Sequence, residues 1–314
     1  MNVYVAGGAS LVDSASVVET RLQAYVRSRD FDRPTLVIDT QRVRQQFRAL
    51  ARGLGSAHIH YAVKANPHEA VIGTLIEEGS GFDCASRGEI ELCLGLGASP
   101  KNISYGNTIK RARDIAYAYE NGIRLFAADA EEELEKIAVN APGSDVYIRV
   151  LVMSNEADWP LSRKFGCAPE KALQLMGFAV RLGLNPVGIS FHVGSQTREA
   201  RMWESTLNTV ADLWHDAREA GHALKLLNIG GGFPADYGQG GEKPEAYARQ
   251  VVKMIADRFG DVPHLMAEPG RGMVGEAGVI AAEVLLVSKK SNDDLLRWVY
   301  LDIGRFSGLA ETEG

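Results

Sequence analysis

The sequence has little of what would mark a disulfide scaffold, a metal site, a nucleic-acid surface or a membrane span. Its 3 cysteines are too few and too irregularly spaced for a disulfide framework, and none has metal-ligand spacing with histidine. No run of Lys or Arg is longer than two and the formal net charge is -6, which argues against a phosphate-tracking surface. No apolar run approaches the about 20 residues of a membrane span. Metal, nucleic acid and membrane are therefore not expected partners.

The first residues, MNVYVAGGASLVDSASVVET, contain no basic segment ahead of an apolar run, so they do not predict a secretory leader. With 46% hydrophobic residues in 314, the chain can bury a substantial core. This excludes disorder as the main state and suggests one large domain or two of unequal size. We expect a soluble, cytoplasmic protein.

Short apolar, β-branched or aromatic runs alternate with longer amphipathic segments, which predicts βα units. After a first run at 35–40, strands are predicted at 58–64, 81–86, 103–107, 124–129, 145–152, 186–194, 224–232 and 264–271. Predicted helices include 70–79, 87–97, 130–140, 169–183 and 244–260, and several end in a glycine that suits a C-cap. Eight strands, each followed by a helix, predict a (β/α)8 TIM barrel.

The pattern changes after Arg271. Two apolar runs, at 278–290 and 297–306, are separated by the polar turn SNDDLL, which predicts an antiparallel hairpin and the start of a β-rich second domain. We expect an N-terminal arm (1–33) packing on that domain, a barrel (34–271), and the start of the β domain (272–314). A sheet fragment of this kind would leave an edge and an apolar face uncovered. We therefore expect the natural protein to continue beyond Gly314.

Ionisable residues and glycines occupy the predicted strand ends, which is where a (β/α)8 barrel builds its site. Any one of them alone is more often an ordinary solvated residue, but several converge on one rim. They are Lys64, Asp83, Asn107, Asp129, Arg149, His192, glycines 230–232, Glu268 and Arg271.

Lys64, in the stretch YAVKANP, alternates in register with Ala62 and His60, so it points to the barrel interior or to its rim. It could be an ordinary surface lysine. Buried near like charges, it would instead have a lowered pKa and act as an amine nucleophile that forms a Schiff base. Asp83 could balance or orient it.

The segment NIGGGF (228–233) places three glycines directly after a strand, where bare N–H groups can wrap an anion. A tight turn also needs glycine. EPGR (268–271) follows the next strand, and a phosphate site formed after strands seven and eight recurs in this fold. His192, in FHVGSQ, lies one strand away. It is either a satisfied core histidine or a ring that stacks on a flat ligand.

A lysine, a phosphate loop, a stacking ring and a carboxylate together describe a site for pyridoxal 5'-phosphate (PLP). The Schiff base would form through Lys64, and the phosphate would lie on Gly232, Gly270 and Arg271. Glu268 would keep the pyridine nitrogen protonated, so that the ring serves as an electron sink.

With these residues, the sequence resembles the fold-type III PLP-dependent basic amino-acid decarboxylases of the ornithine/diaminopimelate/arginine decarboxylase family, and most closely bacterial ornithine decarboxylase. The resemblance runs through YAVKANP, GFDCASRGEIE, LSRKFG, SFHVGSQ, LNIGGGFP, EPGRGMV and YLDIG. It implies an alanine-racemase-like barrel in which Lys64 carries the cofactor, His192 stacks on its ring and Glu268 bonds the pyridine nitrogen. The other implied cofactor residues are Ser195, Gly231, Gly232, Gly270 and Arg271 around the phosphate, and Asp83, Glu89 and Arg149 around the lysine.

The resemblance also implies a homodimer with shared sites, reached by Lys164 in the loop after strand five. The family's C-terminal domain supplies the neighbouring site with a cysteine that reprotonates the substrate carbon, an aspartate and a tyrosine, and none has a counterpart here. Cys84, Cys93 and Cys167 belong to other motifs. Asp302 falls near the residue that recognises the substrate's distal amine, although LDIG departs from the eukaryotic pattern. Little turnover is expected if the chain stops at Gly314.

The function implied is decarboxylation of a basic amino acid, with ornithine to putrescine, a step of polyamine biosynthesis, as the first choice. Lysine and meso-diaminopimelate are near alternatives, because HVGSQ also occurs in diaminopimelate decarboxylases. An alternative of another class is a non-catalytic PLP-binding or regulatory homologue. A racemase is disfavoured, because Glu268 makes a strong electron sink.

Overall fold

The computed structural model describes residues 21–152, 164–238 and 240–310. The chain divides into two compact units. The barrel unit comprises Thr40–Asp236 and Gly241–Val274, and the β unit comprises Met1–Asp39, Tyr237–Gly240 and Gly275–Gly314. In the part of the chain that the structure describes, no helix is long and apolar enough to cross a membrane.

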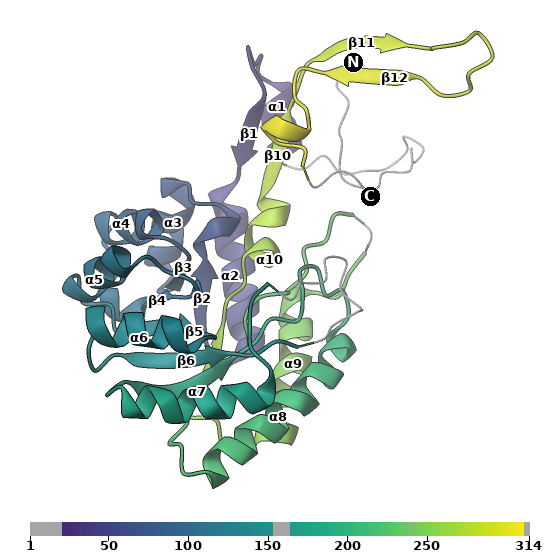
Figure 1. Cartoon of the computed structure of the whole chain (residues 1–314). Helices are drawn as coiled ribbons and strands as arrows, with labels where there is room; N and C mark the ends of the chain where they lie inside the picture. The colour runs from purple at the N-terminus through teal and green to yellow at the C-terminus, as the bar shows by residue number, and fades with distance from the viewer. Residues whose placement is uncertain (1–20, 153–163, 239, 311–314) are drawn as a thin grey trace. The chain divides into compact units, whose positions relative to one another are not determined.

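Eight strands close the barrel in sequence order (Figure 1). Each pairs in parallel with the next, and β9 returns to pair with β2. The predicted (β/α)8 barrel is thus confirmed, although every barrel strand ends one to four residues before the predicted position. The strands are β2 (His58–Ala62), β3 (Gly81–Cys84), β4 (Ile103–Tyr105), β5 (Leu125–Ala128), β6 (Asp145–Arg149), β7 (Asn185–Ser190), β8 (Leu226–Asn228) and β9 (His264–Ala267).

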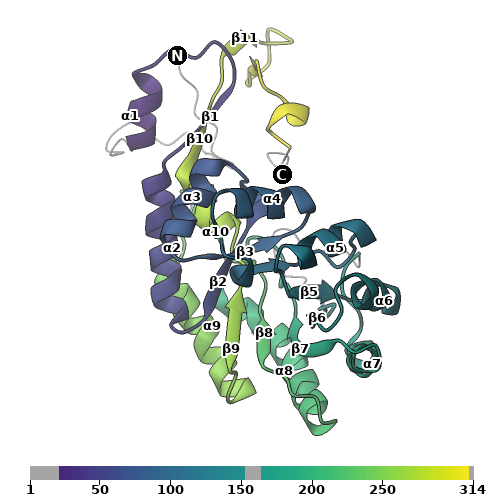
Figure 2. The same ribbon diagram turned by 90° about the vertical axis from the view of Figure 1, so that its left-hand side faces the viewer.

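Helices surround the barrel strands (Figure 2). The expected glycine ends are present, since Gly79 and Gly183 follow α3 and α7 with φ of 81° and 76°. The helices of this unit are α2 (Thr40–Leu54), α3 (Glu69–Glu77), α4 (Arg87–Gly95), α5 (Ala112–Glu120), α6 (Glu131–Asn140), α7 (Pro169–Arg181), α8 (Glu204–Glu219), α9 (Pro244–Phe259) and α10 (Arg271–Val274).

The barrel strands meet in a buried cluster of Ala127, Tyr147, Leu226 and Met266. Side chains from four different strands thus pack together inside the barrel. The outer face is sealed by helices with one apolar stripe. In α2, for example, Val43, Phe47, Leu50 and Leu54 are buried at helical spacing.

The β unit contains two antiparallel strand pairs. β1 (Thr35–Ile38) pairs with β10 (Gly278–Ala281), α1 (Arg21–Arg27) lies beside them, and β11 (Val284–Ser288) pairs with β12 (Trp298–Leu301). The predicted hairpin is therefore present as β11 and β12. The prediction of one strand over 278–290 was wrong, because the run breaks between Ala281 and Val284 and its first part pairs with β1 instead. Residues 1–20 of the predicted arm lie outside the described residues.

Candidate active site

Lys64 lies just past β2, in a short 3₁₀ turn (Val63–Ala65) rather than in the strand. Its Nζ is 3.6 Å from Oδ2 of Asp83, whose side chain is 5% exposed, whereas that of Lys64 is 62% exposed. The Asp83 carboxylate raises the pKa of Lys64, burial opposes this effect and Glu268 adds to it. The expectation of a lowered pKa was therefore wrong, because the nearest charges are of opposite sign.

The carboxylate of Asp83, at the end of β3, packs against the backbone of a glycine, Gly106. Its Oδ1 is buried and has no hydrogen-bond partner in the described part of the protein. A Cβ on Gly106, directly after β4, would lie 1.9 Å from that oxygen and 3.1 Å from the hydroxyl of Tyr147. Position 106 therefore admits only glycine while Asp83 keeps this position. Sequence reasoning missed Gly106, although a glycine at a strand end was a usable signal.

Glu268, just past β9, is fixed by a residue that sequence reasoning also missed. Asn228, at the end of β8, donates from Nδ2 to Oε1 of Glu268 and accepts at Oδ1 from the N–H of Gly230, 2.9 Å away. Burial, and then the charge of Asp83, raises the pKa of Glu268 to about 8. Because Oε1 is occupied by a donor, the protonated form carries its proton on Oε2.

His192 follows β7 and is held as a neutral ring. Its Nδ1 accepts from the N–H of Gly194 at 2.9 Å, so in the neutral ring the proton is on Nε2. Burial, together with the charges of Arg149 and Lys64, lowers the pKa of His192 to about 3. A Cβ on Gly231 would lie 3.1 Å from Nε2, so no side chain stands between this ring and the glycine loop (residues 229–233).

The glycine loop is hydrogen-bonded to the loop after β7. Gly230 and Gly232 have φ of 65° and 100°, and the carbonyl of Gly232 accepts from the N–H of Thr197 at 3.0 Å. Gln196, with φ of 59°, donates to the carbonyl of Ala235 at 2.7 Å and accepts from its N–H at 2.9 Å. These bonds hold Gln196 in a left-handed conformation that is uncommon outside glycine. They fix the loop that carries Ser195 beside the glycines.

The loop after β9 adjoins the same region. The N–H of Glu268 donates to the carbonyl of Gly230 at 2.8 Å, and the carbonyl of Pro269 accepts from the N–H of Ala62 at 3.2 Å. Gly270 directly follows that proline, and α10 begins at Arg271. The loops that follow β7, β8 and β9 are thus joined by backbone hydrogen bonds. The loop after β9 is also bonded to β2, the strand that leads to Lys64.

Arg149 and Glu89 complete the group of charges around Lys64. Both act on the pKa of Lys64, Arg149 by lowering it and Glu89 by raising it. Glu89 accepts from the N–H of Ala85 at 2.6 Å, and burial raises the pKa of this carboxyl. The guanidinium of Arg149 lies 5.4 Å from the centroid of the Phe165 ring. The structure therefore brings the three predicted neighbours of the lysine together.

Some residues at strand ends do other work. Asn107 donates to the carbonyl of Ala85 at 3.2 Å, and Asp129 accepts from the N–H of Gly166 at 2.7 Å, so both hold loop backbone. Asp302 belongs to the β unit and accepts from the N–H of Glu283 at 2.9 Å.

Lys164, predicted to reach a partner subunit, lies 4.9 Å from the centroid of the neighbouring Phe165 ring. Residues 153–163 of its loop are outside the described residues. Its role stays a prediction.

These residues fit a phosphorylated ring that bears an aldehyde. Lys64 offers an exposed amine beside a buried carboxylate, Glu268 holds a proton with a pKa of about 8, and His192 is neutral. The glycine loop is a cradle that side chains would fill, because a Cβ on Gly231 would meet the carbonyl of Glu268 at 2.9 Å. The arrangement suits proton transfer and stabilisation of a carbanion next to a bound phosphate. Among the described residues, no group of three His, Cys, Asp or Glu is placed to hold a metal ion.

Comparison with known proteins agrees with this geometry. The model of the family described as "Pyridoxal-dependent decarboxylase, pyridoxal binding domain" matches residues 40–275. A lysine/ornithine decarboxylase of Selenomonas ruminantium is 35% identical over 279 residues, which cover 88% of this chain and 70% of that protein. Antizyme inhibitor 2 of Xenopus laevis is 34% identical over 245 residues, which cover 77% of this chain and 53% of that protein. The chain thus spans between about half and 70% of these relatives.

Among solved structures, a lysine/ornithine decarboxylase of Vibrio vulnificus in complex with putrescine is similar. It superposes with a TM-score of 0.80 at 33% identity, covering 91% of this chain and 76% of that one.

Proposed function

This chain belongs to the pyridoxal-dependent decarboxylases, and on that premise we propose that it removes the α-carboxylate of a basic amino acid, with ornithine as the first candidate. The observation that carries the proposal is the exposed amine of Lys64, 3.6 Å from the buried carboxylate of Asp83. An accessible amine paired with a fixed acid is suited to bind an aldehyde covalently.

Pyridoxal phosphate, when bound, supplies an electron sink for the pair of electrons that the departing carboxylate leaves behind. In our proposal Lys64 holds the cofactor and Asp83 fixes Nζ at the mouth of the barrel. The phosphate is held by Ser195, Gly231, Gly232, Gly270 and Arg271.

In the same proposal, the carboxyl group of Glu268 forms a hydrogen bond with the pyridine nitrogen of the cofactor. Asn228 occupies Oε1, so Oε2 is the atom that holds or shares a proton with the ring. A pKa of about 8 lies close to neutral pH, where the carboxyl can keep a proton or give it up at little cost. His192 presents a neutral imidazole, which adds no positive charge to compete with the protonated ring.

For the substrate, the relatives support ornithine and lysine together. The Selenomonas and Vibrio proteins are both lysine/ornithine decarboxylases by name, and the latter was solved with putrescine. We place ornithine first, lysine second and meso-diaminopimelate third. Asp302 as a contact for the distal amine, and assembly into a cytoplasmic homodimer, remain parts of the proposal. Sedimentation of the purified protein tests the assembly, and a monomer at micromolar concentration would contradict it.

The decisive experiment loads the protein with pyridoxal phosphate and follows its visible absorption and its release of carbon dioxide. We expect the lysine-bound cofactor band in the natural protein and in the control Lys101→Ala, which alters an exposed lysine. We expect no such band in Lys64→Ala or in Lys64→Arg, because neither side chain offers an amine that forms the Schiff base. Release should be fastest from ornithine among the three amino acids. An unchanged band in Lys64→Ala would sink the cofactor assignment. Faster release of carbon dioxide from lysine or diaminopimelate would show that this amino acid, and not ornithine, is the preferred substrate.

A second candidate is a non-catalytic regulator, which the similarity to an antizyme inhibitor supports. The two candidates separate in the same experiment. A regulator would release no carbon dioxide from any of the three amino acids even when Lys64 carries the cofactor.

A further inference from the structure

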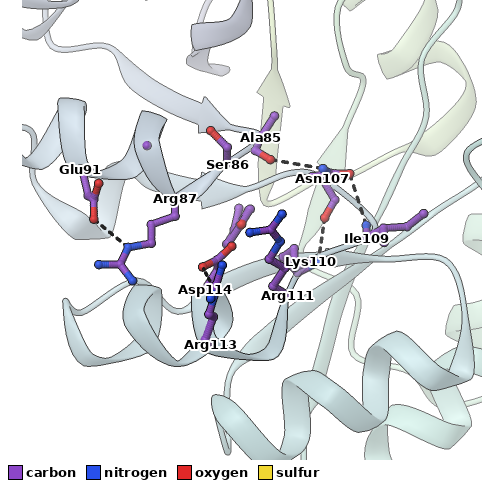
Figure 3. A pocket seen from close by; sticks show the side chains of 12 residues that line it. Ala85, Ser86, Arg87, Glu91, Asn107, Ile109, Lys110, Arg111, Arg113 and Asp114 are labelled. Carbon is purple, nitrogen blue, oxygen red and sulfur yellow. Dashed lines mark hydrogen bonds and ion pairs between the residues drawn. The ribbon is translucent and has the colours of Figure 1, made fainter.

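A separate cavity of about 670 Å³ opens beside the loops that follow β3 and β4 (Figure 3). Its wall contains none of the residues proposed above to hold the cofactor, although it includes Ala85, whose N–H bonds to Glu89, and Asn107. Its volume lies within the roughly 300–1,000 Å³ that small-molecule sites occupy. The charged side chains that line it are Arg87, Lys110, Arg111, Arg113, Glu91 and Asp114.

The charges in this cavity leave a positive excess. Glu91 is engaged by Nε of Arg87 at 2.7 Å, and Asp114 lies 3.8 Å from Nε of Arg113. Arg111 makes no ion pair within the described ranges of the chain. The cavity is therefore a local basic site on a chain whose formal net charge is -6.

Lys110 does not contribute to that excess. Its side chain is fully buried, and its Nζ is 2.9 Å from Oε1 of Glu133, which is not part of the cavity wall. The basic groups left for a ligand are thus the guanidinium of Arg111 and those N–H groups of Arg87 and Arg113 that Glu91 and Asp114 do not occupy. All three side chains line the cavity (Figure 3).

Arg87 is held in place before any ligand arrives. Its guanidinium lies 4.0 Å from the centroid of the Tyr117 ring, and its Nε bonds to Glu91. Its conformational freedom is thereby reduced, so a ligand that binds it has less side-chain entropy to overcome. Arginine is suited to phosphate because its planar N–H groups can bind two oxygens at once.

Tyr105, at the end of β4, adds a hydroxyl to the lining of the cavity. The residue lines the cavity although it is only 2% exposed, and its hydroxyl has no hydrogen-bond partner among the residues that the structure describes. Burial, with the charge of Asp114 next, raises the pKa of Tyr105, so the hydroxyl stays protonated and can donate. The hydroxyl is therefore available to donate to a ligand oxygen in the cavity.

We propose that this cavity binds the phosphate group of a small phosphomonoester through the guanidinium groups of Arg87, Arg111 and Arg113 and the hydroxyl of Tyr105. The alternative ligand is a diamine, which would bind the carboxylates of Glu91 and Asp114 in the same wall. Both carboxylates already face an arginine, so the unsatisfied groups are donors, and donors select an anion.

The test uses protein fully loaded with pyridoxal phosphate, so that the phosphate site of the barrel is already filled. Ribose 5-phosphate, inorganic phosphate and putrescine are titrated by calorimetry in a buffer free of phosphate. We expect the ester to bind with a dissociation constant below about 1 mM. If inorganic phosphate binds equally well, the site takes the free ion as well as the ester. If it binds about tenfold more weakly, the organic part contributes.

Arg111→Gln should weaken the binding of the ester about tenfold, as the loss of one charged hydrogen-bonding group does. Tyr105→Phe should weaken the binding of the ester about fivefold. Arg181→Gln is the matched control, because Arg181 is exposed at the end of α7, and should bind as the natural protein does. Arg111 is exposed, so its variant should melt at the natural temperature and decide the question even if Tyr105→Phe fails to fold. Three results would overturn the proposal: no heat from either phosphate at about 10 mM, equal binding by Arg111→Gln, or binding of putrescine in their place.

Discussion

Replacing Glu268 by Gln should flatten the pH dependence of the stability of the cofactor-free protein. In the folded chain the pKa of this carboxyl is about 8, against an ordinary value of 4.5, because the group is buried and faces Asp83. A folded-state pKa above the unfolded one means that the folded state binds the proton more tightly. The stability it confers is therefore complete below about pH 4.5 and is lost as the pH rises to about 8.

The size of the effect follows from the shift. Each pKa unit corresponds to about 1.4 kcal/mol, so the natural protein should lose roughly 3 to 5 kcal/mol of its free energy of unfolding between about pH 4.5 and pH 8 through this group. Glutamine resembles the protonated carboxyl in shape, and its Oε1 can still accept from Asn228. Glu268→Gln should therefore match the natural protein near pH 5 and be more stable near pH 8.

Denaturant unfolding, followed by circular dichroism at several pH values in this range, measures the difference. Other groups titrate in both proteins, so only the gap between the two curves reports on Glu268. Glu120→Gln, which alters an exposed carboxyl at the end of α5, should run parallel to the natural protein. If Glu268→Gln also runs parallel, the carboxyl is not protonated in the folded state and our account of its role is wrong.

Three further substitutions test the site and its support. Asn228→Ala should destabilise the protein by about 1–3 kcal/mol, because it leaves buried Glu268 without its hydrogen-bond donor. It should also weaken the binding of pyridoxal phosphate, measured by a fluorescence titration. Unchanged binding would show that Asn228 does not support the cofactor site. Gly231→Ala should weaken the cofactor more than about tenfold with the fold intact, because its Cβ would lie 2.9 Å from the carbonyl of Glu268, and normal affinity would contradict the cradle. Lys110→Met should cost about 1–3 kcal/mol of unfolding free energy, because it removes one of the two lysines that pair with buried Glu133 while Lys136 stays 2.6 Å away. Adding Glu133→Leu should recover part of the loss, and no recovery would show that Lys110 and Glu133 are uncoupled.

The barrel and its rim were predictable because both depend on local pattern. Alternating apolar runs define strands and helices, and parallel strands bring their carboxyl ends to one side of a barrel. Lys64, Asp83 and Glu268 could therefore be assigned to one rim without knowledge of any contact. The strand ends were set too late, since an apolar residue such as Val63 continues the pattern of β2 although it already belongs to the turn.

The net electrostatic effect at Lys64 was not predictable from the same pattern, which allowed both like charges and the carboxylate of Asp83 beside the lysine. Ala62 in β2 pairs with Asp83 in β3, so the turn that carries Lys64 begins beside a carboxylate. That register is a property of the closed sheet, in which every strand is fixed by two neighbours. A sequence lists the charges on the rim, but which of them face one another depends on the stagger between strands.

The residues that sequence reasoning missed share this cause. Asn228 matters because its amide reaches across from β8 to Glu268 after β9, and Gln196 matters because it bonds both backbone groups of Ala235. Each is a polar residue whose function lies in a partner on another strand or loop. In a barrel the groups that do chemistry can be recognised by where their strands end, whereas the groups that orient them become visible only when neighbouring strands are in register.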